Sequence, residues 1–327
     1  MVKSGSESWL TQHAEVIGVF LAAVTAFIAW LVNKSYDAPP HLLSSIRFCD
    51  GFIFMASVNA LPTLYFDDSG TDAQSPIAIA AGYILHVSQL GPFDNDWREA
   101  EMVEGFKVFH MTDFGARQGE FKGPEWDDTN KRKRTLNRLI GIAKIRSRSC
   151  FSVAVQKSAY DQVILSDPVL AKICGRYHYT FAVHGCLDKV YQWRERFAKG
   201  NDLRYVFDRM SKGKGEIIEI FDAYRGHPSN AFGIVDGGFS FDSKEVVRQL
   251  QSADILAWHS LQHMQEHHLR GLPPRTEMRD LMGCPNYNGY YTRQPLQKLR
   301  EGLLKTEAYQ ITKEELGKEP RQFRTAG

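Results

Sequence analysis

The sequence lacks a strong net charge, paired cysteines and internal repeats, and these absences exclude several functional classes. Its 327 residues carry 40 Lys and Arg against 38 Asp and Glu, a formal net charge of +2. Net charge therefore gives no sign of a polyanionic partner, and nucleic-acid binding has to be argued from local clusters. The five cysteines are widely spaced and include no C-x-x-C pair. This spacing disfavours structural zinc and favours a reducing compartment.

Long hydrophobic runs are also scarce, apart from one near the N-terminus. Residues 16–32 form an uncharged run of 17 residues between Glu15 and Lys34. A span of the bilayer needs about 20 apolar residues, so this run lies at the lower limit for a transmembrane helix. The sequence predicts an N-terminal segment (1–35) that anchors the chain in the membrane, with the main domain in the cytoplasm. Two alternatives stay open: a buried helix, or a soluble cytoplasmic protein translated from Met55.

An acidic strand near the start of the main domain is the best-defined local feature. The stretch 64–72, LYFDDSGTD, runs from apolar residues into Asp67 and Asp68 and then into a turn at Ser69 and Gly70. Side chains alternate across a strand, so the two carboxylates point to opposite faces. We expect Asp67 to face a site and Asp68 to serve the turn.

The remaining pattern predicts an α/β domain over residues 61–270, after a linker at 36–60. Apolar runs predict strands at 76–85, 107–111, 150–155, 203–208 and 232–241. Helical periodicity predicts helices at 94–106, 131–148, 177–197 and 216–224, and a capping-box pattern at 242–245 predicts the start of a last core helix. The expected fold is a mixed sheet flanked by helices. Residues 271–327 read as an irregular C-terminal extension that ends in one amphipathic helix near 295–306.

The last core helix carries an acid in its apolar stripe. Asp254 lies on the same face as Leu250 and Trp258, and a buried carboxylate needs an ion pair, a proton or a metal. A salt bridge to Lys or Arg is the structural alternative to a metal. His259, His263 and His267 follow at intervals of four and are interpreted as outward-facing, since zinc or nickel would need a further converging ligand.

The helix at 131–148 is strongly basic, with eight Lys or Arg and no acid. A solvated face is the simplest interpretation, and a surface that contacts nucleic-acid phosphates is the functional one. The candidate phosphate-binding residues are Lys131, Arg132, Lys133, Arg134 and Arg138.

Three carboxylates stand out by position: Asp67 and Asp208 at the ends of strands, and Asp254 on the inward helix face. If the first strand neighbours the later one, both strand ends open on the same edge of the sheet, beneath the helix. Clustered carboxylates repel one another unless cations lie between them, and oxygen ligands favour Mg²⁺ or Mn²⁺. One or two such ions activate water for phosphodiester hydrolysis.

The motifs YFDDSG, FHMTD, YVFD and LQSADILAW, in this order, resemble the domain of unknown function 3800 family (DUF3800) of the ribonuclease H-like superfamily. The resemblance covers about residues 61–262. It implies a ribonuclease H-like fold and implicates Asp67, Asp68, Ser69, His110, Asp208 and Asp254. Asp68 stands where the family usually has Glu. Enzymes of the superfamily generally add a Glu from the helix after the third strand, and the basic helix has none, which leaves Asp113, Glu216 or no residue for that role.

The expected function is metal-dependent nuclease activity on DNA or RNA, with Asp67, Asp208 and Asp254 as metal ligands and His110 assisting catalysis. The alternatives are a non-catalytic metal- or nucleic-acid-binding module at the membrane, and a protein-interaction role without metal, which a salt bridge from Asp254 to a buried base would favour.

Overall fold

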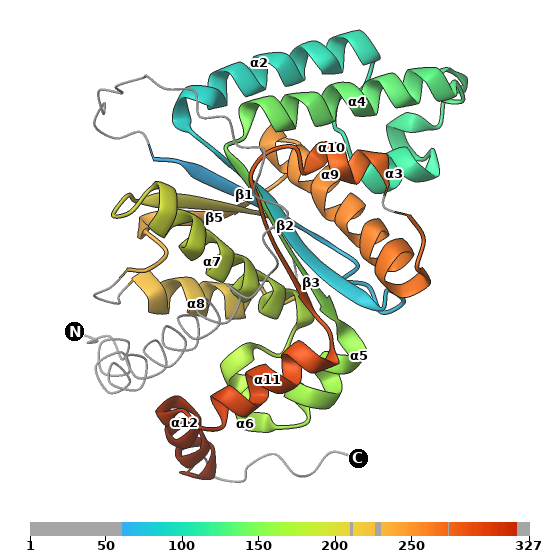
Figure 1. The fold of residues 1–327 in the computed structure, drawn as a ribbon. Helices are drawn as coiled ribbons and strands as arrows, with labels where there is room; N and C mark the ends of the chain where they lie inside the picture. The colour runs from blue at the N-terminus through green and yellow to red at the C-terminus, as the bar shows by residue number, and fades with distance from the viewer. Residues whose placement is uncertain (1–60, 210–211, 226–229, 274, 319–327) are drawn as a thin grey trace, which may run out of the picture. The chain divides into compact units, whose positions relative to one another are not determined.

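The computed structural model describes residues 61–209, 212–225, 230–273 and 275–318. Six strands form one mixed sheet in the order β5-β4-β1-β2-β3-β6 (Figure 1). They are β1 (Thr63–Ser69), β2 (Ile77–Leu85), β3 (Ser149–Gln156), β4 (Leu203–Asp208), β5 (Ile234–Asp242) and β6 (Asn286–Tyr291). Helices flank the sheet, so the predicted α/β class with a mixed sheet is confirmed.

Strand directions place the ends of β1 and β4 at one edge. β2 is antiparallel to both β1 and β3, whereas β4 is parallel to β1, β5 to β4 and β6 to β3. The register pairs Phe66 of β1 with Phe207 of β4. The next residue on each strand is the predicted acid, Asp67 or Asp208.

Two groups of helices cover the sheet. The helices are α2 (Val87–Glu104), α3 (Met111–Ala116), α4 (Thr129–Arg146), α5 (Lys157–Tyr160), α6 (Pro168–Cys174), α7 (His178–Phe197), α8 (Lys214–Arg225), α9 (Arg248–His263), α10 (Thr276–Leu281), α11 (Arg293–Leu303) and α12 (Glu307–Lys318). In Figure 1, α7 and α8 lie on one side of the sheet, and α9 lies on the other with α2, α4 and α10 beyond it. Residues 61–301 form one compact unit, and the residues from 302 onward belong to a second unit.

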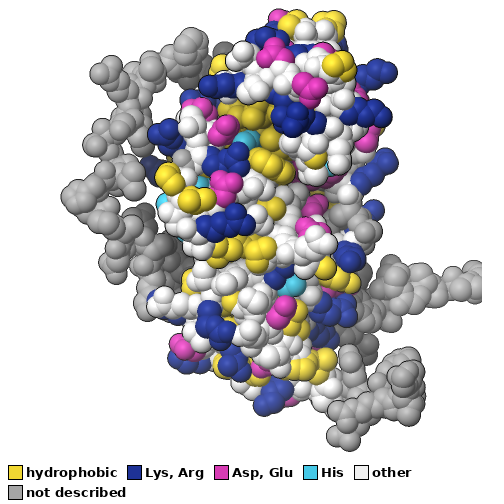
Figure 2. Space-filling model, turned by 90° about the vertical axis from the view of Figure 1, so that its right-hand side faces the viewer, with side chains coloured by type: hydrophobic (Ala, Val, Ile, Leu, Met, Phe, Trp, Pro, Cys, Tyr) yellow, Lys and Arg dark blue, Asp and Glu magenta, His cyan; other side chains and the backbone are white. Residues whose placement is uncertain are grey.

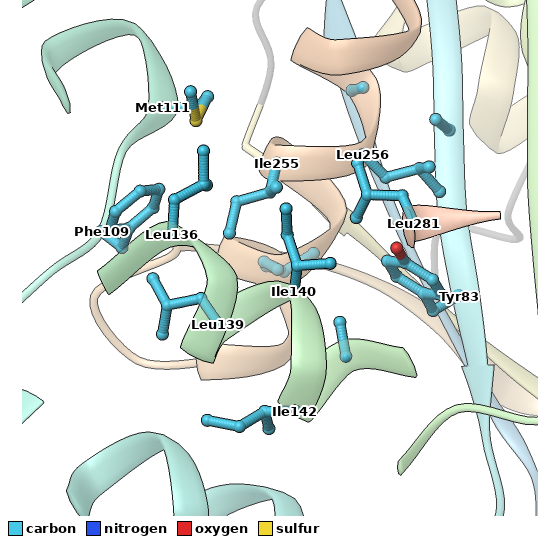
Figure 3. Packing of buried hydrophobic residues seen from close by; sticks show 14 of the residues in the cluster. Tyr83, Phe109, Met111, Leu136, Leu139, Ile140, Ile142, Ile255, Leu256 and Leu281 are labelled. Atoms are coloured by element: carbon cyan, nitrogen blue, oxygen red, sulfur yellow. The ribbon is translucent and has the colours of Figure 1, made fainter. Parts of the chain in front are cut away.

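The main core lies between the sheet and the layer of α9, α4 and α2. Figure 3 shows Leu139 and Ile140 of α4 near Ile255 and Leu256 of α9, with Tyr83 of β2 at the right of the cluster. Residues three and four apart on a helix share a face, so each helix presents a continuous apolar stripe here. This packing fixes α9 against the strands that carry the acids.

The predicted strand at 107–111 is wrong. Residues 107–110 form an irregular bend, Met111 begins α3, and the third strand in chain order is β3, which follows α4. Side chains bind the backbone donors of the segment. Phe109 N donates to Gln251 Oε1 of α9 at 2.8 Å and Met111 N to Asp254 Oδ2 of α9 at 2.6 Å, while Lys107 N and Val108 N donate to Glu120. Because these polar side chains satisfy the backbone, no neighbouring strand is needed.

Two boundaries near the end of the domain also differ from prediction. The capping-box interpretation of 242–245 is wrong, because α9 begins at Arg248 and residues 243–247 form a turn closed by the Ser243 carbonyl. The segment 286–291, predicted as irregular, is strand β6, which pairs with β3. The predicted amphipathic helix near 295–306 is α11, and the further helix α12 follows it.

The N-terminal predictions fall on undescribed residues. The predicted transmembrane helix at 16–32 and the linker at 36–60 both lie outside the described part of the chain. Of the helices within residues 61–318 that the structure describes, none has the length and apolar character needed to cross a membrane.

Candidate functional site: an acid cluster around Lys244

Three carboxylates meet where β1, β4 and α9 come together. Asp67 extends from β1 on the same face as the buried Tyr65, toward α9, and its side chain is only 1% exposed. Asp208 ends β4 and Asp254 lies in the second turn of α9, with side chains 18% and 7% exposed. We call Asp67, Asp208 and Asp254 the acid cluster.

A lysine lies at the centre of the acid cluster. The Lys244 ammonium nitrogen is 2.8 Å from Asp67 Oδ2, 3.1 Å from Asp208 Oδ2 and 3.0 Å from Asp254 Oδ1. Lys244 belongs to the turn at 243–247, between β5 and α9. The three acids converge, but they do so around a base that was not predicted from the sequence. The salt bridge expected as the structural alternative for Asp254 is formed with Lys244.

Burial and mutual repulsion shape the charges in the cluster. Burial raises the pKa of Asp67 well above its usual range, the Lys244 ammonium opposes this rise, and Asp254, Asp68 and Asp208 add to it. Burial on its own would lower the pKa of Lys244, but Asp254, Asp67 and Asp208 outweigh burial and raise it. Lys244 is thus held as a cation, and a single ammonium faces three carboxylates.

Asp67 Oδ2 is the most constrained oxygen of the site. It is fully buried and accepts no hydrogen bond of good geometry. The charged group beside it is the Lys244 ammonium. An ionised oxygen in this position depends on a cation for stability.

Gln251 of α9 holds two neighbouring segments in place. Its Oε1 accepts from Trp97 Nε1 at 3.0 Å and from Phe109 N at 2.8 Å, and its Nε2 donates to the Lys244 carbonyl at 2.8 Å. The backbone of Lys244 and the segment before His110 are therefore fixed by one buried amide. Gln251 was not predicted as a site residue, although it stands in the LQSAD motif.

His110 lies at the exposed rim of the cluster. It is the residue before α3 and is 40% exposed. Its Nδ1 is 3.2 Å from Asp113 Oδ2, and its Nε2 is 3.8 Å from Asp254 Oδ1. His110 thus lies between the cluster and Asp113, where solvent reaches it.

No known protein family, curated protein or solved structure matches this chain. The DUF3800 resemblance therefore stays a prediction, and the assignment of function depends on the geometry of the acid cluster.

The secondary candidates lie outside the three ion pairs. Asp68 accepts a hydrogen bond from Thr71 Oγ1 at 2.6 Å, so it serves the turn, and Ser69 ends β1 beside it. Glu216 of α8 accepts from the backbone and side chain of Arg176, at 3.0 to 3.1 Å, and contacts none of the three acids. On α7, burial raises the pKa of Tyr179 and the charges of Asp68, Asp67 and Asp208 raise it further. Tyr179 therefore lies in the field of the cluster.

Most of the predicted phosphate-binding residues on α4 are engaged within the protein. Arg134 pairs with the buried Glu104 at 3.0 Å, and Arg138 pairs with Glu99 at 2.7 Å. Arg132 donates to the Phe114 carbonyl at 2.7 Å, and Lys131 lies over the Trp126 ring. Lys133 is exposed. On the face shown in Figure 2, basic and acidic side chains are interspersed rather than separated.

Of His259, His263 and His267, His259 differs from the prediction of outward-facing side chains. His259 is 1% exposed, and both of its ring nitrogens lack hydrogen-bond partners. Burial, with a smaller contribution from Arg275, lowers the pKa of His259 to about 3. Further along, the rings of His263 and His267 stack with centroids 5.0 Å apart. The prediction fails at His259 because that position faces the core.

The acid cluster has suitable donors for a divalent metal, but a cation already lies among them. Carboxylate oxygens are the ligands that Mg²⁺ and Mn²⁺ prefer. Among the described residues, no group of three or more His, Cys, Asp or Glu side chains is arranged to hold a metal. Mg²⁺ requires oxygens at about 2.0–2.1 Å, so it cannot share the position between these oxygens with an ammonium. The three carboxylates offer the kind of oxygen that divalent ions bind, and a divalent ion would have to take the place of the Lys244 ammonium.

Proposed function

We propose that this protein is a divalent-metal-dependent nuclease built on a ribonuclease H-like sheet. The observation that carries the proposal is the meeting of Asp67, Asp208 and Asp254, from three separate elements, at one edge of the sheet. The sheet supports it as well: β1 lies between the antiparallel β2 and the parallel β4, the arrangement that brings the two strand-end acids together.

Burying three carboxylates together costs free energy, and this cost favours a functional role for the acid cluster. Replacing a buried ion pair by apolar side chains is often neutral or stabilising, so buried charges contribute little to stability. Here burial, together with the smaller effect of the neighbouring carboxylates, leaves Asp67 with a raised pKa in the folded protein. Such perturbed groups at a partly open site are typical of catalytic or metal-binding residues.

The proposed chemistry assigns a role to each residue. Asp67, Asp208 and Asp254 would hold the metal, which when bound lowers the pKa of a water and stabilises charge on phosphate oxygens. His110, at the exposed rim and 3.8 Å from Asp254, is placed to orient water or to transfer a proton. Asp113 holds the other ring nitrogen of His110 and so sets its orientation.

The proposed substrate is DNA or RNA. Of the five residues predicted on α4, Lys133 and the outer part of Arg134, whose side chain is 61% exposed, remain available to phosphates. The pairing of Arg134 and Arg138 with acids reduces the positive field of this helix. We therefore expect weak, salt-sensitive binding rather than a high-affinity surface.

The test is cleavage of single- and double-stranded DNA, RNA and an RNA–DNA hybrid by the full chain with Mn²⁺ or Mg²⁺. Asp67→Asn should reduce cleavage to the level of the buffer, because it removes a proposed metal ligand. Asp236→Asn is the matched control, since the Asp236 side chain is 98% exposed and lies outside the acid cluster. Equal cleavage by wild type and Asp67→Asn would indicate contamination and refute the assignment.

A second candidate is favoured by Lys244 itself. If the ammonium is a permanent counter-ion, the domain is a non-catalytic interaction module that needs no metal at the acid cluster. Calorimetric titration with Mn²⁺ separates the two functions. Binding that Asp67→Asn abolishes supports the nuclease, and no binding at millimolar Mn²⁺ supports the interaction module.

A further inference from the structure

Lys244 occupies the position where the proposed function requires a metal. Its ammonium lies within a narrow range of 2.8 to 3.1 Å of one oxygen from each of the three acids. No other residue contacts all three carboxylates in the described part of the chain. Lys244 is therefore the group that holds the acid cluster together when no metal is bound.

The charge of the ammonium is too small to neutralise the cluster. One positive charge faces three carboxylates, and the buried Asp67 Oδ2 has no hydrogen-bond donor of good geometry. A divalent ion supplies twice the charge and shorter bonds to the same oxygens. The cluster is thus preassembled for a stronger cation than the one it holds.

The backbone of Lys244 is fixed while its side chain has a way out. Gln251 Nε2 donates to the Lys244 carbonyl at 2.8 Å, which holds the turn to α9. The Lys244 side chain is 13% exposed, and the neighbouring Asp208 and His110 are more exposed still. A flexible four-carbon stem allows the ammonium to move toward solvent without displacing the backbone.

We propose that Lys244 is an internal competitor of the metal: its ammonium keeps the three carboxylates assembled in the metal-free protein and leaves the cluster when a divalent cation binds. The inference rests on the proposed metal-dependent function. It makes Lys244 a positioning residue that sets the metal concentration at which the site fills.

The test measures Mn²⁺ binding to the full chain by electron paramagnetic resonance of free Mn²⁺. Lys244→Met keeps the length of the stem and removes the charge. It should bind Mn²⁺ at least about tenfold more tightly than wild type, equivalent to about 1.4 kcal/mol of lost competition. Lys214→Met is the matched control and should bind as wild type does, because Lys214 lies over the Phe241 ring rather than among the acids.

The outcomes separate this inference from the proposed function. Equal affinities for wild type and Lys244→Met, or weaker binding by the variant, would refute competition while leaving a metal-dependent nuclease in place. Absence of Mn²⁺ binding by both proteins would refute the metal-dependent function and the competition that rests on it. Binding by the variant alone would support competition in its strongest form.

Thermal unfolding provides a second readout. In EDTA, Lys244→Met should melt below wild type because the acids repel one another without a cation, and Mn²⁺ should raise its Tm more than that of wild type. If the variant does not fold, a crystal of the wild-type protein soaked in Mn²⁺ decides. Mn²⁺ among the three acids with the Lys244 ammonium displaced supports the inference, and an unmoved Lys244 at saturating Mn²⁺ refutes it.

Discussion

Replacing Gln251 by Met should destabilise both the fold and the site, because one amide serves three partners. Met has nearly the same length as Gln and suits the buried surroundings, so packing is largely preserved. The change removes the acceptor of Trp97 Nε1 and Phe109 N and the donor to the Lys244 carbonyl. Trp97 and Phe109 are fully buried, so water cannot replace the lost acceptor.

The expected cost follows from the number of groups left without partners. A buried donor that loses its acceptor costs about 1–3 kcal/mol, so two of them give a loss of about 2–6 kcal/mol in the free energy of unfolding. Lys244 is a partly exposed residue in a turn, so we expect water to bond its carbonyl at little further cost. A loss of this size is a large part of the stability of a typical domain.

Urea unfolding followed by tryptophan fluorescence measures the effect. Gln249→Met is the matched control on the same helix, since Gln249 makes a single side-chain hydrogen bond, from Nε2 to Asp94 at 3.0 Å, and should lose about 1 kcal/mol. The same loss for both variants would show that the three bonds of Gln251 do not act as the structure indicates. Loss of Mn²⁺ binding in Gln251→Met alone would connect the amide to the site.

Two further predictions concern the core. Gly82→Ala should lower the free energy of unfolding by about 1–3 kcal/mol, because the new Cβ would collide with the Tyr65 carbonyl and the Phe66 ring. Gly141→Ala, in open space within α4, should instead raise it by about 0.5–1 kcal/mol. Melting temperatures check both, and equal shifts would contradict the packing of β1 on β2. Burial lowers the pKa of His259 to about 3, below the value of about 6.5 for an unfolded chain, so the unfolded state binds more protons and stability falls as pH drops from about 6.5 toward 3. His259→Leu should reduce the fall in the free energy of unfolding between pH 6.5 and 5, as measured by urea titrations. If the fall is the same in wild type and variant, His259 is not the buried neutral group that causes it.

The local sequence pattern was sufficient to predict most strands of the sheet. The apolar runs at 150–155 and 203–208 form β3 and β4, and the run at 232–241 forms most of β5, with a register shift against β4. The segment 107–111 failed because its apolar residues are buried by α9 and α4, and its backbone is satisfied by side chains from distant positions. Such tertiary bonds leave no local periodic signal.

The acid cluster illustrates the same limit at the candidate site. Asp67, Asp208 and Asp254 were recognisable because each is an acid at a strand end or on an apolar face. Lys244 could not be recognised in this way, since in the sequence it belongs to an ordinary polar turn next to a helix. A useful signal was the charge balance: three converging acids require a cation, and Lys244 is the base immediately before the helix that carries Asp254.

The wide separation of the paired residues along the chain has a consequence for how the protein folds. The bond from Met111 N to Asp254 joins residues 143 positions apart, and that from Trp97 to Gln251 spans 154. Long loops must close before such contacts form, which slows folding. During synthesis, the ion pair between Asp67 and Lys244 therefore cannot form until most of the domain has left the ribosome. Until β4 is made, the edge of β1 that later pairs with β4 is open, and an open strand edge is a site where unfinished chains aggregate.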